Sequence, residues 1–159
     1  MQTVSLKNIY LLLLLALILQ LAPWQGFGLL IRPDFILLAV LYWLMRAPHL
    51  CNIGTAWLAG LIVDLISGGL FGQNALAYAL TAFFAVSYQR RLALFNIWQQ
   101  AAYVFVLLIF NQCVLMVLKL FAGEDVPQWT YFLPSVSGTL LWQLVIFSRI
   151  GTEPASSKN

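Results

Sequence analysis

An acid within an apolar run is the feature of this sequence that most invites chemistry. Asp64 is that acid, and leucine, isoleucine, valine and glycine surround it. A carboxylate among apolar side chains is costly to bury and marks a candidate functional residue. A proton or ion relay would need a second acid at the same depth, and the sequence offers none there. We therefore expect a structural latch in which Arg32 pairs with Asp64. Further hydrogen bonds could come from Ser67, Gln73 and Asn74.

The glycines that follow Asp64 suggest a phosphate-binding loop in composition only. The lysine of such a loop and the strand before it are both missing from this part of the sequence. Glycine does allow a backbone conformation that other residues rarely adopt. We therefore expect a tight turn at Gly68, Gly69 and Gly72, between two helices that pack closely.

Two neighbouring amides, Asn111 and Gln112, lie deep in the longest apolar run. Amide side chains in such a setting usually form hydrogen bonds to a neighbouring helix. Alternatively they could face another protein, which makes Asn111 and Gln112 a candidate partner face.

Side chains that catalysis or metal binding would need are scarce. The chain has one histidine, His49, beside a proline in a loop, and no cluster of serine, histidine and acid is visible. Cys51 and Cys113 form neither a Cys-x-x-Cys pair nor a metal-ligand spacing, and we expect both to be small packing residues. The sequence therefore predicts no catalytic residue, no metal site and no cofactor, and the protein is not expected to be an enzyme.

The composition places these residues in a membrane protein. Hydrophobic residues make up 62% of the chain and charged residues only 8%, whereas soluble domains carry about 25% charged residues. A membrane-spanning helix needs roughly 20 apolar residues, and backbone polar groups in lipid must bond within their own helix. We predict an all-α, polytopic membrane protein with about six transmembrane helices, in a single domain over residues 1–150 with a short polar cytoplasmic tail at 151–159. The expected helices cover residues 8–22, 33–45, 53–66, 70–88, 97–120 and 131–147.

Basic residues at the ends of these segments predict the orientation. With six helices, both termini lie on one side, which then carries six of the eight basic residues: Lys7, Arg46, Arg90, Arg91, Arg149 and Lys158. Arg32 and Lys119 lie on the opposite side. Because cytoplasmic loops are enriched in lysine and arginine, both termini are expected in the cytoplasm. The basic residues form no patch, which argues against nucleic-acid binding.

The second segment carries a helix-start signal. Pro33 suits the first turn of a helix, and Asp34 behind it faces the positive end of the helix dipole. The link before this segment, residues 23–28, is rich in turn-forming residues and is expected to be irregular.

Two motifs stand out between Ile31 and Gly72. Arg32-Pro33-Asp34 opens an apolar helix, and Asp64 begins an Asp-x-x-x-Gly turn that ends in Leu-Phe-Gly. With these motifs the stretch resembles the rod shape-determining MreD family of bacteria. The link at residues 46–49 and the stretch 94–100 also look like proteobacterial members. Chain length, number of apolar segments and placement of basic residues agree with the same family.

The resemblance implies a non-enzymatic protein of the bacterial inner membrane, with no catalytic residue to carry over. Members of the family join the elongation complex that builds the lateral cell wall and so maintain rod shape. The closest expected partner is MreC, a single-span protein with an external domain. The wider complex implied by the resemblance contains MreB, RodA, a penicillin-binding transpeptidase and RodZ, with membrane lipid around it.

An alternative is the substrate-binding subunit of a vitamin transporter of the energy-coupling-factor type. Those subunits are also six-span proteins of similar size, and a vitamin pocket could recruit Asp64, Gln73, Asn74 and Glu124. The first apolar segment argues against it, because Ala16 stands alone where an Ala-x-x-x-Ala docking pattern is common. A lipid-handling enzyme is a third alternative, and the scarcity of polar residues within the segments argues against that one.

Overall fold

The computed structural model describes residues 6–23, 25–68, 72–92, 96–123 and 129–150, and within these ranges the chain forms helices and no strand. The longer helices are α1 (Leu6–Leu21), α3 (Phe35–Arg46), α4 (Ile53–Ser67), α5 (Gln73–Leu92), α6 (Ile97–Phe121) and α7 (Leu133–Ile150). Two short helices complete the description: α2 (Phe27–Leu30) and the 3₁₀ helix η1 (Trp129–Phe132). Each longer helix coincides with one expected apolar segment, so the all-α prediction is confirmed.

Length and hydropathy single out two stretches among the described residues that could cross a bilayer unaided. They are α6, with a mean hydropathy of 2.3, and Trp129–Ser148, with a mean hydropathy of 1.3. Helices α1, α3 and α4 are apolar but shorter. Several apolar helices in one bundle, two of them of full membrane length, are typical of a membrane protein.

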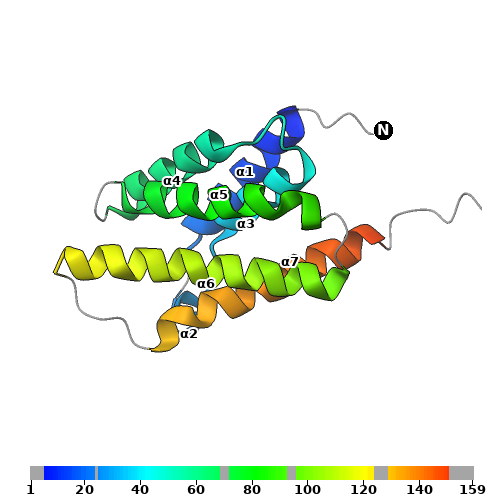
Figure 1. Cartoon of the computed structure of the whole chain (residues 1–159). Helices are drawn as coiled ribbons and strands as arrows, with labels where there is room; N and C mark the ends of the chain where they lie inside the picture. Colours follow the sequence, from blue (N-terminus) through cyan, green and yellow to red (C-terminus); the bar gives the residue numbers. More distant parts are fainter. Residues whose placement is uncertain (1–5, 24, 69–71, 93–95, 124–128, 151–159) are drawn as a thin grey trace, which may run out of the picture.

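Helix α3 forms the centre of the bundle. It packs against α1, α4, α5 and α7, while α4 and α5 lie together on one side and α6 and α7 on the other (Figure 1). Every residue of α3 from Ile36 to Leu44 is buried. A helix that is apolar all round has no face to offer to water, so it is buried by its neighbours.

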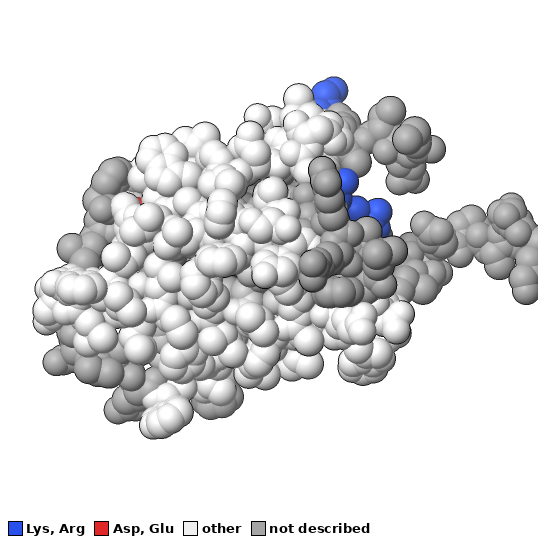
Figure 2. Space-filling view, viewed as in Figure 1, with Lys and Arg blue, Asp and Glu red and all other residues white. Residues whose placement is uncertain are grey.

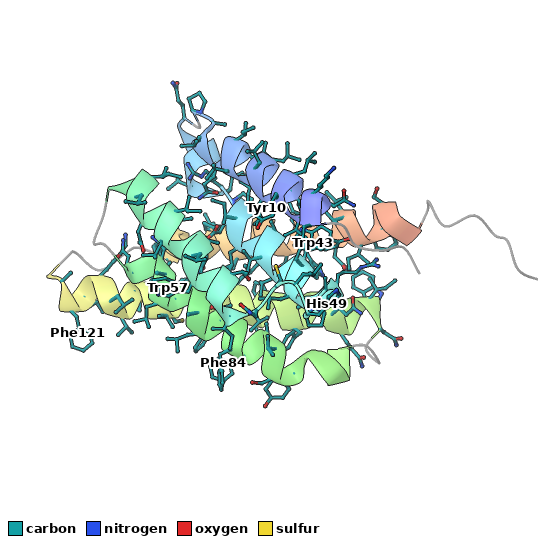
Figure 3. All side chains as sticks on the ribbon, turned by 90° about the horizontal axis from the view of Figure 1, so that it is seen from above. Tyr10, Trp43, His49, Trp57, Phe84 and Phe121 are labelled. Atoms are coloured by element: carbon teal, nitrogen blue, oxygen red, sulfur yellow. The ribbon has the colours of Figure 1, made fainter. Side chains whose placement is uncertain are left out.

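The outside of the bundle is largely apolar. Figure 3 shows Phe84 and Phe121 directed away from the bundle, and both are exposed, as are Tyr10 and Trp57. Leucine, isoleucine and valine side chains are exposed on α1, α4, α5, α6 and α7 as well. Continuous apolar exposure of this extent is unusual for a soluble monomer and fits contact with lipid.

Helices α4 and α5 approach each other closely because small residues line their contact. A Cβ atom added to Gly60 would lie 2.5 Å from the Ala75 Cα and 2.6 Å from the Asn74 carbonyl oxygen. Ala75 and Ala82 of α5 are buried, as is Ala56 of α4. The close packing expected on both sides of the glycine turn is confirmed, since small residues let helix backbones approach.

The turn between these two helices has the backbone conformation that glycine provides. Gly68 ends α4 in the left-handed region, with φ of 64°, and Gly72 has φ of 97°. Residues with a Cβ rarely adopt these values. Gly69, the third glycine of the expected turn, lies outside the described residues.

Two details of the helix boundaries differ from the sequence-based expectation. The link expected to be irregular contains the start of α2, a single short turn of helix. Pro33 was expected in the first turn of its helix, but α3 begins at Phe35 with Asp34 as its N-cap. Asp34 is the better residue at this boundary, because its side chain accepts a hydrogen bond from the Leu37 amide, one of the unpaired backbone amides of the first turn.

The basic side chains that the structure describes lie at the two ends of the bundle. Figure 2 shows the visible lysine and arginine side chains at the end where α1 begins and α7 finishes. Lys7 at the start of α1 and Arg46 at the end of α3 are exposed there. Arg32 and Lys119 belong to the opposite end, where α3 begins and α6 finishes.

Candidate functional site

The Asp64 carboxylate is buried and binds the N-terminal end of α5. One of its oxygens accepts hydrogen bonds from the Asn74 backbone amide at 2.9 Å and from the Asn74 side-chain amide at 2.8 Å. The other oxygen accepts from the backbone amides of Gly72 and Ala75, each at 3.1 Å. The first amides of a helix have no partner within the helix, so Asp64 supplies acceptors that α5 lacks.

The local sequence explains this arrangement. Asp64 lies in the last turn of α4, where a helix dipole disfavours an anion. The glycine turn reverses the chain at once, so the N-terminal end of α5, with its positive dipole and free amides, lies beside Asp64. The anion is thereby stabilised by the helix that follows its own.

The expected latch between Arg32 and Asp64 is not what the structure shows. Both Asp64 oxygens are occupied by donors from the start of α5, and no ion pair joins Asp64 to Arg32 among the described residues. Of the three further donors considered, Asn74 does bind Asp64, whereas the Ser67 hydroxyl donates to the Val63 carbonyl at 2.7 Å. The Gln73 side-chain oxygen is buried without a hydrogen-bond partner.

Asp34 is a second carboxylate that joins helices. It accepts a hydrogen bond from the Leu37 amide at 3.1 Å as the N-cap of α3, and it accepts another from the Tyr78 hydroxyl. Tyr78 is fully buried on α5. Arg32 lies within electrostatic range of Asp34. Asp34 was expected at the helix dipole, but its contact with Tyr78 was missed.

A sequence signal for that contact did exist. Tyr78 follows Asn74 by four residues in the same helix, and residues four apart lie on one helix face. Asn74 was already a candidate partner of an acid. A phenol one turn further along that face could therefore have been assigned to a second acid.

A polar cavity lies at the end of the bundle beside these carboxylates. Its volume is about 230 Å³. Two cations, Arg32 and Lys119, line it, and the Lys119 ammonium lies 5.9 Å from the centre of the Tyr131 ring. The remaining lining residues are Gln20, Pro33, Asp34, Val63, Ser67, Gln73, Asn74, Leu115, Tyr131 and Pro134.

Asn111 and Gln112 both form hydrogen bonds within the bundle. Asn111 is 2% exposed, and its side-chain oxygen accepts a hydrogen bond from the Thr81 hydroxyl of α5 at 3.4 Å. The Gln112 side-chain oxygen accepts from the Ser135 hydroxyl of α7. Each amide is thus used between helices of the same chain, which was the first of the two alternatives for these residues.

The remaining candidate residues show no arrangement for catalysis. His49 is exposed in the link between α3 and α4. Cys51 is buried in the core, and burial raises the pKa of its thiol. Among the described residues, histidine, cysteine and acidic side chains form no group of three that could hold a metal ion.

The fold and the site together define a helical membrane protein in which two carboxylates, the buried Asp64 and the half-buried Asp34, each bind the start of a helix. The chain belongs to the rod shape-determining protein MreD family, whose model matches residues 2–148. The rod shape-determining protein MreD of Haemophilus influenzae is 28% identical over 132 residues, which cover 82% of this chain and 81% of that protein. No solved structure matches this chain.

Family membership confirms the resemblance that was based on residues 31–72 and assigns the chain a role in determining rod shape. The family is one of membrane proteins that determine cell shape and is not a known family of enzymes. The vitamin-transporter alternative receives no support from these similarities.

Proposed function

We propose that this protein is a non-enzymatic, multi-pass scaffold of the bacterial inner membrane that regulates the lateral cell-wall elongation complex through direct contact with MreC. MreB, RodA, a penicillin-binding transpeptidase and RodZ belong to the same complex in this proposal. Both termini face the cytoplasm.

The distribution of charge supports this orientation. The sequence assigns six of the eight basic residues to the end that carries Lys7 and Arg46, and the positive-inside rule makes this more basic end the cytoplasmic one.

Helix α3 is too short to cross a bilayer alone, since its 12 residues rise about 18 Å. It is covered by protein, and non-helical backbone at its ends is tolerated at membrane depth in that case. Fusing a reporter to either terminus should give a cytoplasmic signal, and a tag at Glu124 should be accessible from outside.

The hydrogen bonds of the Asp34 and Asp64 carboxylates support a non-enzymatic role. All four hydrogen bonds to Asp64 come from residues at the start of α5, and Asp34 binds the start of α3 and Tyr78. A catalytic carboxylate must be free to exchange a proton or attack a substrate. The oxygens of Asp34 and Asp64 are instead used in hydrogen bonds that hold helices together.

The observation that carries the MreC contact is the polar cavity beside Arg32 and Lys119. In the proposed orientation this cavity lies on the outer side, which is the side of the MreC external domain. Two cations in a cavity at the end of an apolar bundle offer specific polar contacts that the lipid-facing surface lacks. We place the MreC contact at this cavity rather than on the face of Asn111.

Affinity purification from native membranes tests this placement. Arg32→Glu should reduce the MreC recovered per molecule of purified protein by at least fivefold, because it reverses one of the two cavity cations. Arg32→Lys keeps the charge and should retain most MreC. Ala122→Glu adds an acid at the same end of the bundle, at an exposed position outside the cavity lining, and should bind MreC normally. Equal recovery from all three variants would remove the cavity from the interface.

A further inference from the structure

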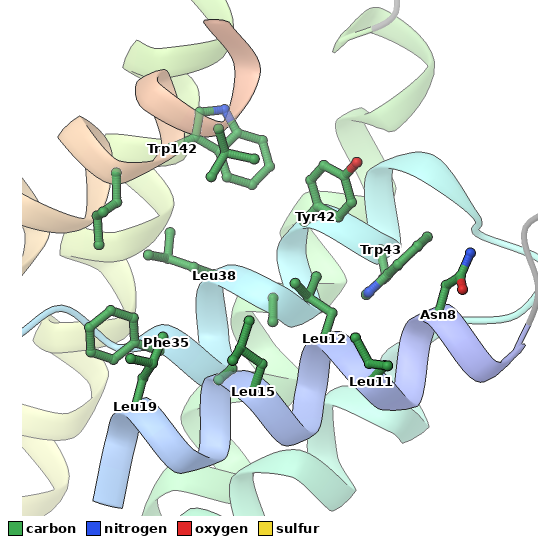
Figure 4. Close-up of a pocket in the computed structure, with 14 residues that line it drawn as sticks. Asn8, Leu11, Leu12, Leu15, Leu19, Phe35, Leu38, Tyr42, Trp43 and Trp142 are labelled. Carbon is green, nitrogen blue, oxygen red and sulfur yellow. The ribbon is translucent and has the colours of Figure 1, made fainter. Parts of the chain in front are cut away.

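An apolar groove lies between α1 and α7, with α3 as its floor (Figure 4). Its volume is about 460 Å³, within the roughly 300–1,000 Å³ of small-molecule sites. It is separate from the polar cavity at the outer end, with no lining residue in common. Nearly all of its lining is apolar: Leu11, Leu12, Leu15, Ala16, Leu19, Phe35, Leu38, Ala39, Leu141 and Val145, with Asn8, Tyr42, Trp43 and Trp142 as the others.

The groove has the length of one lipid leaflet. Figure 4 shows it running along α1 from Asn8 to Leu19. These positions are 11 residues apart, which corresponds to about 16 Å of helix rise. The hydrocarbon core of a bilayer is about 30 Å thick, so one leaflet contributes about 15 Å. An acyl chain that enters at one end would fill the groove without crossing the membrane midplane.

Two residues of the groove lining carry buried hydrogen-bond donors. The indole nitrogens of Trp43 and Trp142 make no hydrogen bond within the described part of the chain, and the two residues are only 6% and 5% exposed. The Trp43 nitrogen is turned toward α1 across the groove (Figure 4). Buried donors in proteins nearly always have an acceptor. An occupant of the groove that carries a carbonyl oxygen would supply one.

Positive charge flanks the end of the groove that Trp43 and Asn8 occupy. Lys7 precedes Asn8 in α1, and Arg46 lies three residues beyond Trp43 in α3, about 4.5 Å further along the helix. Both basic residues are exposed. A headgroup phosphate at Arg46 would therefore place the ester carbonyls of the same lipid about one helical turn deeper, at the level of Trp43.

We propose that the groove between α1 and α7 holds one acyl chain of an anionic phospholipid of the cytoplasmic leaflet, with its phosphate at Lys7 and Arg46 and an ester carbonyl at the Trp43 indole. Basic residues at the mouth of an apolar inter-helix groove favour an anionic headgroup. A transmembrane helix from another protein fits less well, because its backbone carbonyls are already bonded within the helix and cannot accept from Trp43.

Lipid titration of the full-length protein in detergent, read by native mass spectrometry, tests the proposal. The probes are dioleoyl phosphatidylglycerol, which is anionic, and dioleoyl phosphatidylcholine, which has the same chains and no net charge. The wild-type protein should retain one phosphatidylglycerol with a Kd at least tenfold below that for phosphatidylcholine. Arg46→Gln should reduce this preference at least threefold, whereas Lys119→Gln at the opposite end should leave it unchanged.

Filling the groove separates a specific site from general lipid contact. Ala39→Phe places a ring on the groove floor and should raise the Kd for phosphatidylglycerol at least tenfold. Ala102→Phe makes the same change at an exposed position of α6 outside the groove and should have no effect. Leu15→Trp narrows the exposed rim of the groove and gives the same loss if Ala39→Phe fails to fold. Equal binding by these variants would overturn the proposal. A second outcome would also overturn it: the wild-type protein shows no preferred lipid, and the Leu15→Cys variant cross-links from the groove to a second copy or to MreC.

Discussion

Replacing Asp64 by alanine should be among the most destabilising single changes in this protein. The carboxylate accepts four hydrogen bonds, three from backbone amides and one from the Asn74 side chain. Asp64 is 2% exposed, so water cannot replace the lost acceptors without opening the contact between α4 and α5. Each buried donor left without a partner costs roughly 1 kcal/mol or more. Four such donors, with some local relaxation, give an expected loss of about 3–5 kcal/mol, similar to breaking a buried charged contact.

The intermediate substitution refines this expectation. Asp64→Asn keeps one acceptor oxygen and loses the charge, so about half of the destabilisation should remain. Leu65→Ala is the matched control, because Leu65 is the next residue of α4 and is 68% exposed. Leu65→Ala should lower the free energy of unfolding by less than about 1 kcal/mol, since little protein surrounds the Leu65 side chain. The free energy of unfolding can be measured by titrating sodium dodecyl sulfate into maltoside micelles and following helix content by circular dichroism.

A double-mutant cycle decides between the α5 cap and the latch with Arg32. In the structure Arg32 makes no ion pair with Asp64, so the losses from Arg32→Ala and Asp64→Ala should add to within about 0.5 kcal/mol. A coupling energy above about 1 kcal/mol would show that the two charges do interact in solution. An Asp64→Ala loss no larger than that of Leu65→Ala would refute the cap itself.

Three further experiments test the packing. Gly60→Ala should lower the free energy of unfolding by about 1–3 kcal/mol, because the added Cβ would meet the α5 backbone. The control Gly54→Ala, at an exposed position, should change that free energy by less than about 1 kcal/mol in the same titration. Asn111→Leu should cost about 1 kcal/mol or less and leave MreC recovery per folded molecule unchanged; reduced recovery at full stability would restore the lateral interface. The Cys51 thiol, whose pKa burial raises, should stay mostly protonated at pH 7 and react slowly with maleimide until detergent denaturation exposes it; rapid labelling of the folded protein would contradict its burial.

The helices could be predicted from the sequence because each apolar run is long and is separated from the next by proline, glycine or charge. The prediction was less accurate where a few residues decide the structure. The four-residue helix α2 contains a glycine and carries little hydropathy signal. The glycine turn was recognised because positive φ at Gly68 and Gly72 is a property of residue type rather than of tertiary contacts.

The partner of Asp64 could not be predicted in the same way. The sequence gives the approximate depth of a charge in the membrane, and Arg32 has the right sign at the right depth. It does not give the direction in which each side chain leaves its helix. Asn111 and Gln112 illustrate the same limit, because their depth was evident but their contacts with α5 and α7 depend on how the helices are rotated.

The Asp34 and Asp64 carboxylates link the stability of the bundle to its polar cavity. Asp34 and Asp64 hold the starts of α3 and α5. The cavity residue Arg32 precedes Asp34 by two positions, and the cavity residue Gln73 is the first residue of α5. Loss of either carboxylate should therefore disorder the cavity as well as weaken the fold. Loss of Arg32 should alter the cavity charge and leave the fold intact. If the cavity binds MreC, Arg32→Glu should lose MreC at normal unfolding free energy, whereas Asp64→Ala should lose both together. The opposite pattern, with MreC retained by a destabilised Asp64→Ala protein, would place the contact elsewhere on the bundle.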